Sequence, residues 1–157
     1  MNNKKLTLPL LVVSLLFGLT TSAQFRVNPE QKKIAAAFMS YLEHHAVKDA
    51  ENLLISPSVK QQAQIARAEK EIAKIVGKTE LSIIQVEHGN GNLFRARYWI
   101  EGERYDEYYQ ADIIFDNPSS SKISKVKFFG RKELVENAKW REKHSNTPPA
   151  LPPPQIH

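Results

Sequence analysis

The sequence predicts an α+β fold, in which N-terminal helices pack on a four-stranded antiparallel meander sheet to form a cone-shaped domain. Two observations lead to this prediction. The hydrophobic period is about 3.6 residues over residues 28–76 and changes to two after Thr79. Turn sequences then divide residues 82–129 into four successive strands. A sheet with one apolar face needs cover, and the preceding helices are the segments available to supply it.

The helical half begins at a clear start signal, because Asn28 is a good N-cap and Pro29 suits the first helical position. Side chains at three- and four-residue spacing then predict one buried stripe, made of Ile34, Phe38, Tyr41, Leu42 and His45. A short second helix is expected over residues 48–54, and a third over residues 59–76. The third helix is expected to turn four side chains inward: Ile65, Ile72, Ile75 and Val76.

Four strands are expected, over residues 82–88, 93–101, 104–116 and 122–129, with a hairpin turn at 89–92. Alternate residues of a strand point to opposite faces of the sheet. The inner, apolar face is expected to hold Phe94, Ala96, Tyr98, Ile100, Tyr109, Ala111, Ile113, Phe115, Val126 and Phe128. The outer face is expected to hold Arg95, Arg97, Trp99, Tyr108, Gln110, Asp112, Lys125 and Lys127, with exposed charge pairs across the strands.

Both ends of the chain differ in composition from its centre. Residues 1–23 have the order of a secretory signal peptide: two lysines, an apolar run, and small residues before Gln24. The apolar run is shorter than the ~20 residues that a membrane span needs. We therefore expect an exported protein, periplasmic or secreted, without a stable membrane span after cleavage. Residues 144–157 hold five of the nine prolines and favour an extended tail.

One domain is expected between these ends, over residues 24–143, with a short helix at 133–143 that turns Leu134, Val135 and Ala138 inward. Removing residues 1–23 from the 157 leaves 134 residues, and the formal charge falls from +5 to +3 with the loss of two lysines. Lys and Arg alternate with Asp and Glu along the chain, which argues against a nucleic-acid partner. The absence of cysteine excludes disulfides, thiolate metal sites and cysteine nucleophiles.

Several segments resemble a known superfamily. They are Phe-Met-Ser-Tyr-Leu at 38–42, the helical piece at 48–54, Ser-Pro-Ser-Val at 56–59 and the closing strand at 122–129. Together with the order of helices before a meander, they resemble the nuclear transport factor two-like superfamily of cystatin-like folds. The resemblance implies a cone-shaped cavity between sheet and helices. It implies no particular use, because the superfamily includes isomerases, dehydratases, ligand binders and interaction modules.

Two functions are expected from the side chains. The first is a non-enzymatic contact with an envelope or secreted protein, as in an assembly or secretion system; a homodimer is an alternative. Tyr, Trp and Arg are enriched at binding hot spots, and the residues expected to bind are Arg95, Arg97, Trp99, Tyr105 and Tyr108. The second is a small hydrophobic ligand in the cone, with isomerase-like or dehydratase-like turnover and Tyr98 as a hydroxyl donor. The burial habit of tyrosine favours the other role for Tyr98, a core aromatic whose hydroxyl is satisfied at the rim.

The sequence favours the first function, because it places no acid and base together. Asp112 is expected on the outer face and Asp106 near a turn, whereas a general base must be positioned at the substrate. His44 and His45 diverge by about 100° on a helix, so they are poorly placed to bind one metal ion. We therefore expect no metal and no cofactor.

Overall fold

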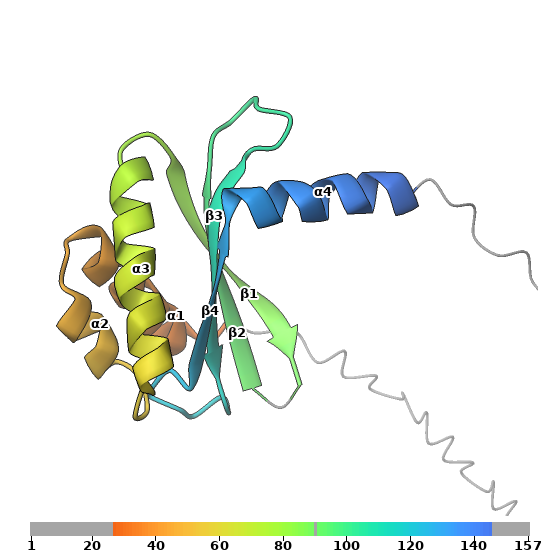
Figure 1. Ribbon diagram of the computed structural model, residues 1–157. Coiled ribbons are helices and arrows are strands. Elements are labelled where there is room, and N and C mark those ends of the chain that lie inside the picture. The colour runs from red at the N-terminus through yellow and green to blue at the C-terminus, as the bar shows by residue number, and fades with distance from the viewer. Residues whose placement is uncertain (1–26, 90, 146–157) are drawn as a thin grey trace, which may run out of the picture.

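The computed structural model describes residues 27–89 and 91–145 (Figure 1). Helices α1 (Pro29–Glu43), α2 (Val47–Asn52) and α3 (Val59–Ile75) precede the sheet. The strands are β1 (Glu80–His88), β2 (Gly91–Trp99), β3 (Glu107–Phe115) and β4 (Lys125–Gly130), and helix α4 (Arg131–Ser145) follows them. The predicted signal peptide and the predicted tail beyond residue 145 lie outside the described residues.

The four strands form one antiparallel sheet in the order β1-β2-β3-β4, so the predicted meander and the α+β class are confirmed. Helices α1 to α3 cover one face of the sheet, the inner face. Helix α4 leaves the end of β4 on the opposite side and extends away from the outer face (Figure 1). No helix in the described part of the chain is long and apolar enough to cross a membrane.

The start of α1 is anchored to the sheet by polar contacts. The side chain of Asn28 accepts a hydrogen bond of 3.1 Å from the backbone N–H of Gln31, as expected of an N-cap. The Gln31 side chain is buried, and its amide donates to the backbone carbonyls of Asn117 and Ser120, each at 2.9 Å. These bonds satisfy a buried polar group and hold α1 against the loop between β3 and β4.

The core lies between α1 to α3 and the inner face. The predicted inner residues of β2 and β3 are buried, from Phe94 to Tyr98 and from Tyr109 to Phe115. Phe94 and Phe115 meet edge to face with their ring centroids 5.8 Å apart. Full burial of one such aromatic side chain stabilises the fold by about 1.5–3 kcal/mol. The helices contribute Ala35, Phe38, Met39, Leu42, Ala50, Ile65, Ala68 and Ile72, and the segment after α2 contributes Leu54.

The predicted helical stripes are wrong at three positions. Tyr41 is exposed, because the buried side of α1 runs through Gln31, Ala35, Phe38, Met39 and Leu42. His45 is exposed beyond the end of α1, with a positive φ of 60°. Val76 is 40% exposed, because α3 ends at Ile75 and Val76 begins the turn into β1.

A β-bulge changes the face of one predicted residue. Tyr98 pairs with Tyr109, but the next residue, Trp99, pairs with Glu107, so Tyr108 is an extra residue in β3. Such bulges re-aim side chains. Tyr108 was expected on the outer face; instead it lines a cavity on the inner side together with Tyr109.

Candidate functional site

The first predicted site residue, Tyr98, belongs to the core. Its side chain is 1% exposed, and its hydroxyl donates a hydrogen bond of 2.8 Å to Oε1 of Glu43 at the end of α1. Burial of the hydroxyl is the main cause that raises the pKa of Tyr98 well above its ordinary value, and the hydrogen bond with Glu43 raises it further. The hydroxyl therefore stays protonated and is already engaged within the protein.

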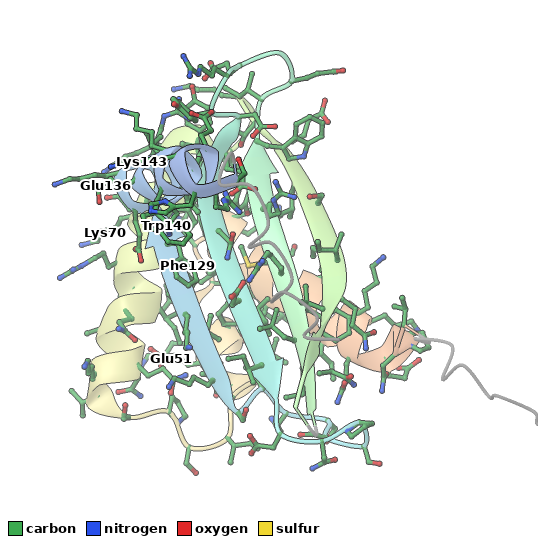
Figure 2. All side chains as sticks on the ribbon, turned by 90° about the vertical axis from the view of Figure 1, so that its right-hand side faces the viewer. Glu51, Lys70, Phe129, Glu136, Trp140 and Lys143 are labelled. Atoms are coloured by element: carbon green, nitrogen blue, oxygen red, sulfur yellow. The ribbon has the colours of Figure 1, made fainter. Side chains whose placement is uncertain are left out.

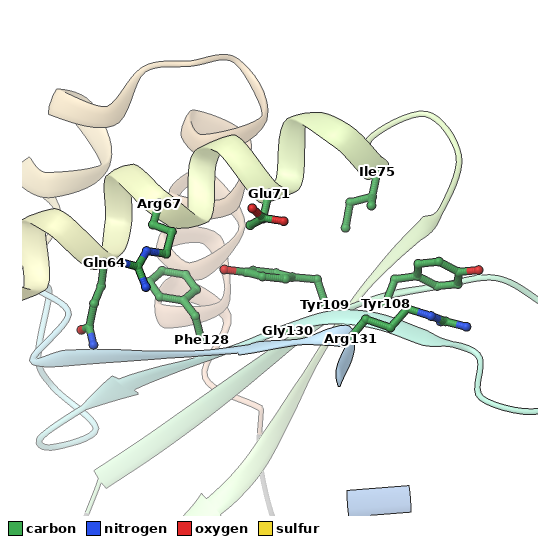
Figure 3. A pocket seen from close by; sticks show the side chains of 9 residues that line it. All are labelled: Gln64, Arg67, Glu71, Ile75, Tyr108, Tyr109, Phe128, Gly130 and Arg131. Carbon is green, nitrogen blue, oxygen red and sulfur yellow. The ribbon is translucent and has the colours of Figure 1, made fainter. Parts of the chain in front are cut away.

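A cavity of about 470 Å³, which we call the inner cavity, opens between α3 and the ends of β3 and β4 (Figure 3). Its size is within the range of small-molecule sites. Helix α3 and the sheet supply opposite walls, and Arg131 at the start of α4 closes one end. The lining residues are Gln64, Arg67, Glu71, Ile75, Tyr108, Tyr109, Phe128, Gly130 and Arg131.

The floor of the inner cavity is aromatic. The rings of Tyr109 and Phe128 lie 6.1 Å apart, tilted by 33°. Burial raises the pKa of Tyr109; the nearby carboxylate of Glu71 raises it further, and the guanidinium of Arg67 lowers it. The Tyr109 hydroxyl therefore remains a neutral hydrogen-bond donor at physiological pH, beside one cation and one anion.

The rim of the inner cavity is held by a stacked pair. The guanidinium of Arg131 lies 3.6 Å from the centre of the Tyr108 ring, which is a close cation–π contact (Figure 3). The Tyr108 hydroxyl donates to both carboxylate oxygens of Glu103, at 2.9 and 2.8 Å, and this bonding raises the pKa of Tyr108. Arg131 also donates to Glu103, at 3.1 Å. These contacts set the bulged tyrosine in one orientation.

A second cavity, of about 450 Å³, lies between α4 and the outer face of the sheet; we call it the outer cleft. Two of the predicted binding residues, Arg95 and Arg97, lie there together. Its lining residues are Ile84, Arg95, Arg97, Glu107, Gln110, Phe129, Leu134, Asn137, Trp140 and Arg141.

Arg95 and Asp112 form a two-pronged ion pair beneath the outer cleft, with N–O distances of 2.8 and 3.0 Å. The prediction that this cross-strand pair is exposed is wrong, because Asp112 is only 6% exposed. The amide of Gln110 also donates to Asp112, at 2.9 Å, so the carboxylate is enclosed by its neighbours. The hydrogen bond with Asp112 raises the pKa of Arg95. The pair fixes the position of the Arg95 side chain in the cleft wall.

The other two arginines of the outer cleft are less fully paired. Arg97 forms an ion pair with Glu107, but its Nε is buried and finds no hydrogen-bond partner among the described residues. Arg141 is exposed, and none of the carboxylates whose side chains the structure describes lies within ion-pair distance of it. The cleft therefore carries cationic donors with spare capacity for an acceptor.

The most exposed aromatic residue near these arginines, Trp140, was not among the predicted site residues. It is 62% exposed and lines the outer cleft, as Phe129 does; both side chains are labelled below α4 in Figure 2. Its ring stacks on His144, with centroids 4.2 Å apart. The sequence carried a signal for this grouping, since Leu134, Asn137 and Arg141 recur at helical spacing around Trp140.

The remaining predicted residues lie apart from the outer cleft lining. Trp99 is half-buried at the end of β2, opposite Glu107. Tyr105 lies in the loop before β3, and its hydroxyl donates to Glu142 of α4 at 3.2 Å. Arg104 lies over the Tyr105 ring, 5.4 Å from its centre. Tyr105 thus supports α4 from the side rather than lining the cleft.

No group of three or more His, Asp or Glu side chains in the described segments is arranged to hold a metal ion. No family model, curated protein or solved structure matches this chain.

Proposed function

We propose that this protein is an exported, non-enzymatic binding module with a nuclear transport factor two-like fold, which contacts another envelope or secreted protein through α4 and the outer cleft. An accessory role in an envelope assembly or secretion system is one form of this function. The observation that carries the proposal is the 62% exposure of Trp140 on a helix that projects from the sheet, with Arg141 beside it on α4 and with Arg95 and Arg97 in the sheet wall of the same cleft. Exposed Trp and Arg side chains are the residues most enriched at protein-binding hot spots.

The contacts of the tyrosines support binding rather than catalysis. The hydroxyl of Tyr98 is held by Glu43, and that of Tyr108 by Glu103. A general acid or base must instead have its proton free to transfer to a substrate. The inward hydroxyl that the sequence suggested for turnover is therefore committed to the fold.

A site-specific crosslinking experiment tests the proposal. A photo-crosslinking amino acid would replace Trp140, and in a matched variant it would replace Lys60, which is exposed on α3 on the other side of the sheet. We expect one defined partner protein to be crosslinked from position 140 and not from position 60 in cells that export the protein. Equal labelling from both positions, or none from position 140, would contradict the proposal.

The inner cavity supports a second candidate function, the binding of a small hydrophobic molecule. Its aromatic floor would contact an apolar body, and the Tyr109 hydroxyl would donate to one acceptor group of the ligand. Titration with 1-anilinonaphthalene-8-sulfonate tests this function. We expect saturable binding that is lost in Ile75→Trp, which fills the cavity, and kept in Val76→Trp, at the exposed neighbouring position. Equal binding by both variants would count against the inner cavity.

A further inference from the structure

The charges that line the outer cleft are unequal. Three guanidinium groups line it, from Arg95, Arg97 and Arg141, against a single carboxylate, that of Glu107. The buried carboxylate of Asp112 neutralises Arg95 from below. One positive charge therefore remains, and the exposed lysines at positions 125 and 127 of neighbouring β4 add to it. The field in the cleft favours an anionic occupant.

Arg97 and Arg141 are the groups placed to receive that anion. Both also line a smaller cleft of about 240 Å³ beside α4, so they lie at the junction of two openings under the helix. Leu134 and Arg141 are seven residues apart and share the side of α4 that faces the sheet. The Arg97 side chain is 34% exposed, although its unpartnered Nε is itself buried, and the Arg141 side chain is exposed.

Apolar side chains lie next to these donors. Phe129, in β4, and Trp140, in α4, both line the outer cleft (Figure 2), and Ile84, which is 45% exposed, extends the apolar lining to the edge strand β1. A free carboxylate or phosphate alone would leave these side chains exposed to water. An occupant that fits the whole cleft carries an anion and an apolar group side by side.

We infer that the outer cleft binds an acidic, extended peptide segment of the partner protein. An Asp or Glu side chain of the peptide contacts Arg97 and Arg141, and a neighbouring apolar side chain packs between Phe129 and Trp140. This inference rests on the proposed protein-binding function and specifies the chemistry of the partner. A nucleic acid fits less well, because its affinity comes from rows of cations, whereas the lining of the outer cleft keeps one positive charge in excess of the carboxylates that pair with it.

Tryptophan fluorescence provides a direct test, because the chain has two tryptophans. In a Trp99→Phe background, Trp140 is the sole tryptophan and reports occupancy of the outer cleft. The probe is the synthetic peptide Gly-Asp-Leu-Glu-Phe-Glu-Asp-Gly, and its matched control replaces each acid by its amide. We expect the acidic peptide to shift the Trp140 emission saturably, and the amide peptide to bind about tenfold more weakly or worse, a difference that one lost charged contact can produce.

Two variants on the same helix distinguish binding in the outer cleft from nonspecific attraction to a positively charged surface. We expect Arg141→Gln to weaken binding of the acidic peptide about tenfold, and Lys143→Gln, with the same loss of charge one half-turn away, to leave it within about twofold. Circular dichroism confirms that both variants fold. Equal effects of the two variants, equal affinity for the amide peptide, or tighter binding of single-stranded DNA or phosphatidylglycerol vesicles would overturn the inference. If crosslinking from position 140 persists while the acidic peptide fails to bind, the inference fails and the proposed protein contact stands.

Discussion

The hydroxyl of Tyr98, near the end of β2, donates a 2.8 Å hydrogen bond to the carboxylate of Glu43, in the last turn of α1. Tyr98 is fully buried, so this bond joins the inner face of the sheet to the helical layer where water does not compete freely. A tyrosine that the sequence offered as a reactive group is thus a structural connection between the two layers.

Tyr98→Phe is expected to lower the free energy of unfolding by about 1.5 kcal/mol, because it removes a buried hydrogen bond to a charged group. Urea denaturation followed by circular dichroism measures the change. Tyr105→Phe is the matched control; it removes a hydroxyl that bonds to exposed Glu142 and should cost less than about 0.5 kcal/mol. Similar losses in the two variants would refute the assignment of Tyr98 to a stabilising role.

Stability is expected to fall in alkaline solution. Burial raises the pKa of Tyr98 and of Tyr109 in the folded protein above the value of about 10 in the unfolded chain. The folded state therefore holds these protons more tightly. The stabilisation is fully present below pH ~10 and is lost progressively as the pH rises above it. Denaturation between pH 8 and 11, in about half-unit steps, should show a decline that is smaller in the Tyr98→Phe, Tyr109→Phe double variant; an unchanged decline would contradict the prediction.

Gly91 is required by close packing rather than by an unusual backbone angle. A Cβ at this position would overlap the carbonyl oxygen of Phe115 and lie 2.9 Å from that of Asp116. Gly91→Ala is therefore expected to destabilise the protein by about 3 kcal/mol, measured by thermal unfolding. Gly130→Ala is the control, because nothing lies within 4 Å of a Cβ built there. A Gly91→Ala variant as stable as Gly130→Ala would disprove the steric account.

Export is expected to remove residues 1–23 and to leave Gln24 as the first residue. Signal peptidases require small side chains before the cleaved bond, and Ala23 supplies one. Mass spectrometry of the exported protein measures the cleavage site. Ala23→Leu should retain the longer form, whereas Ala36→Leu, a similar exposed change outside the signal, should be processed normally. Processing of both variants at Gln24 would argue against this site.

Side-chain alternation made the inner face of the sheet predictable. Because β2 and β3 are regular between residues 94 and 98 and between 109 and 115, each second residue faces the helices, as expected. The bulge at Tyr108 shifts the alternation of inward and outward side chains by one residue. Tyr108 therefore lines the inner cavity instead of lying on the outer face. No turn residue or proline marks this bulge, since it arises from the pairing of two strands rather than from either one alone.

The outer cleft was less predictable than the sheet. Arg95 and Arg97 were expected on the outer face, but the burial of Asp112 depends on side chains from two neighbouring positions. The place of Trp140 depends on the direction in which α4 leaves β4. That direction is set by the packing of Leu134, the one buried side chain of α4 among those described. Helical spacing shows which residues share a side of a helix but does not tell where that side lies.

Helix α4 begins at Arg131 directly after Gly130, without an intervening loop. Its first residue closes the inner cavity, and its later residue Trp140 lines the outer cleft. The same helix therefore lines both cavities, although they open on opposite sides of the sheet. A bound molecule that displaced Arg131 from the Tyr108 ring and moved α4 with it would also change the free energy of occupying the outer cleft. By thermodynamic linkage, an occupant of the outer cleft would then change the affinity of the inner cavity for its ligand by the same factor.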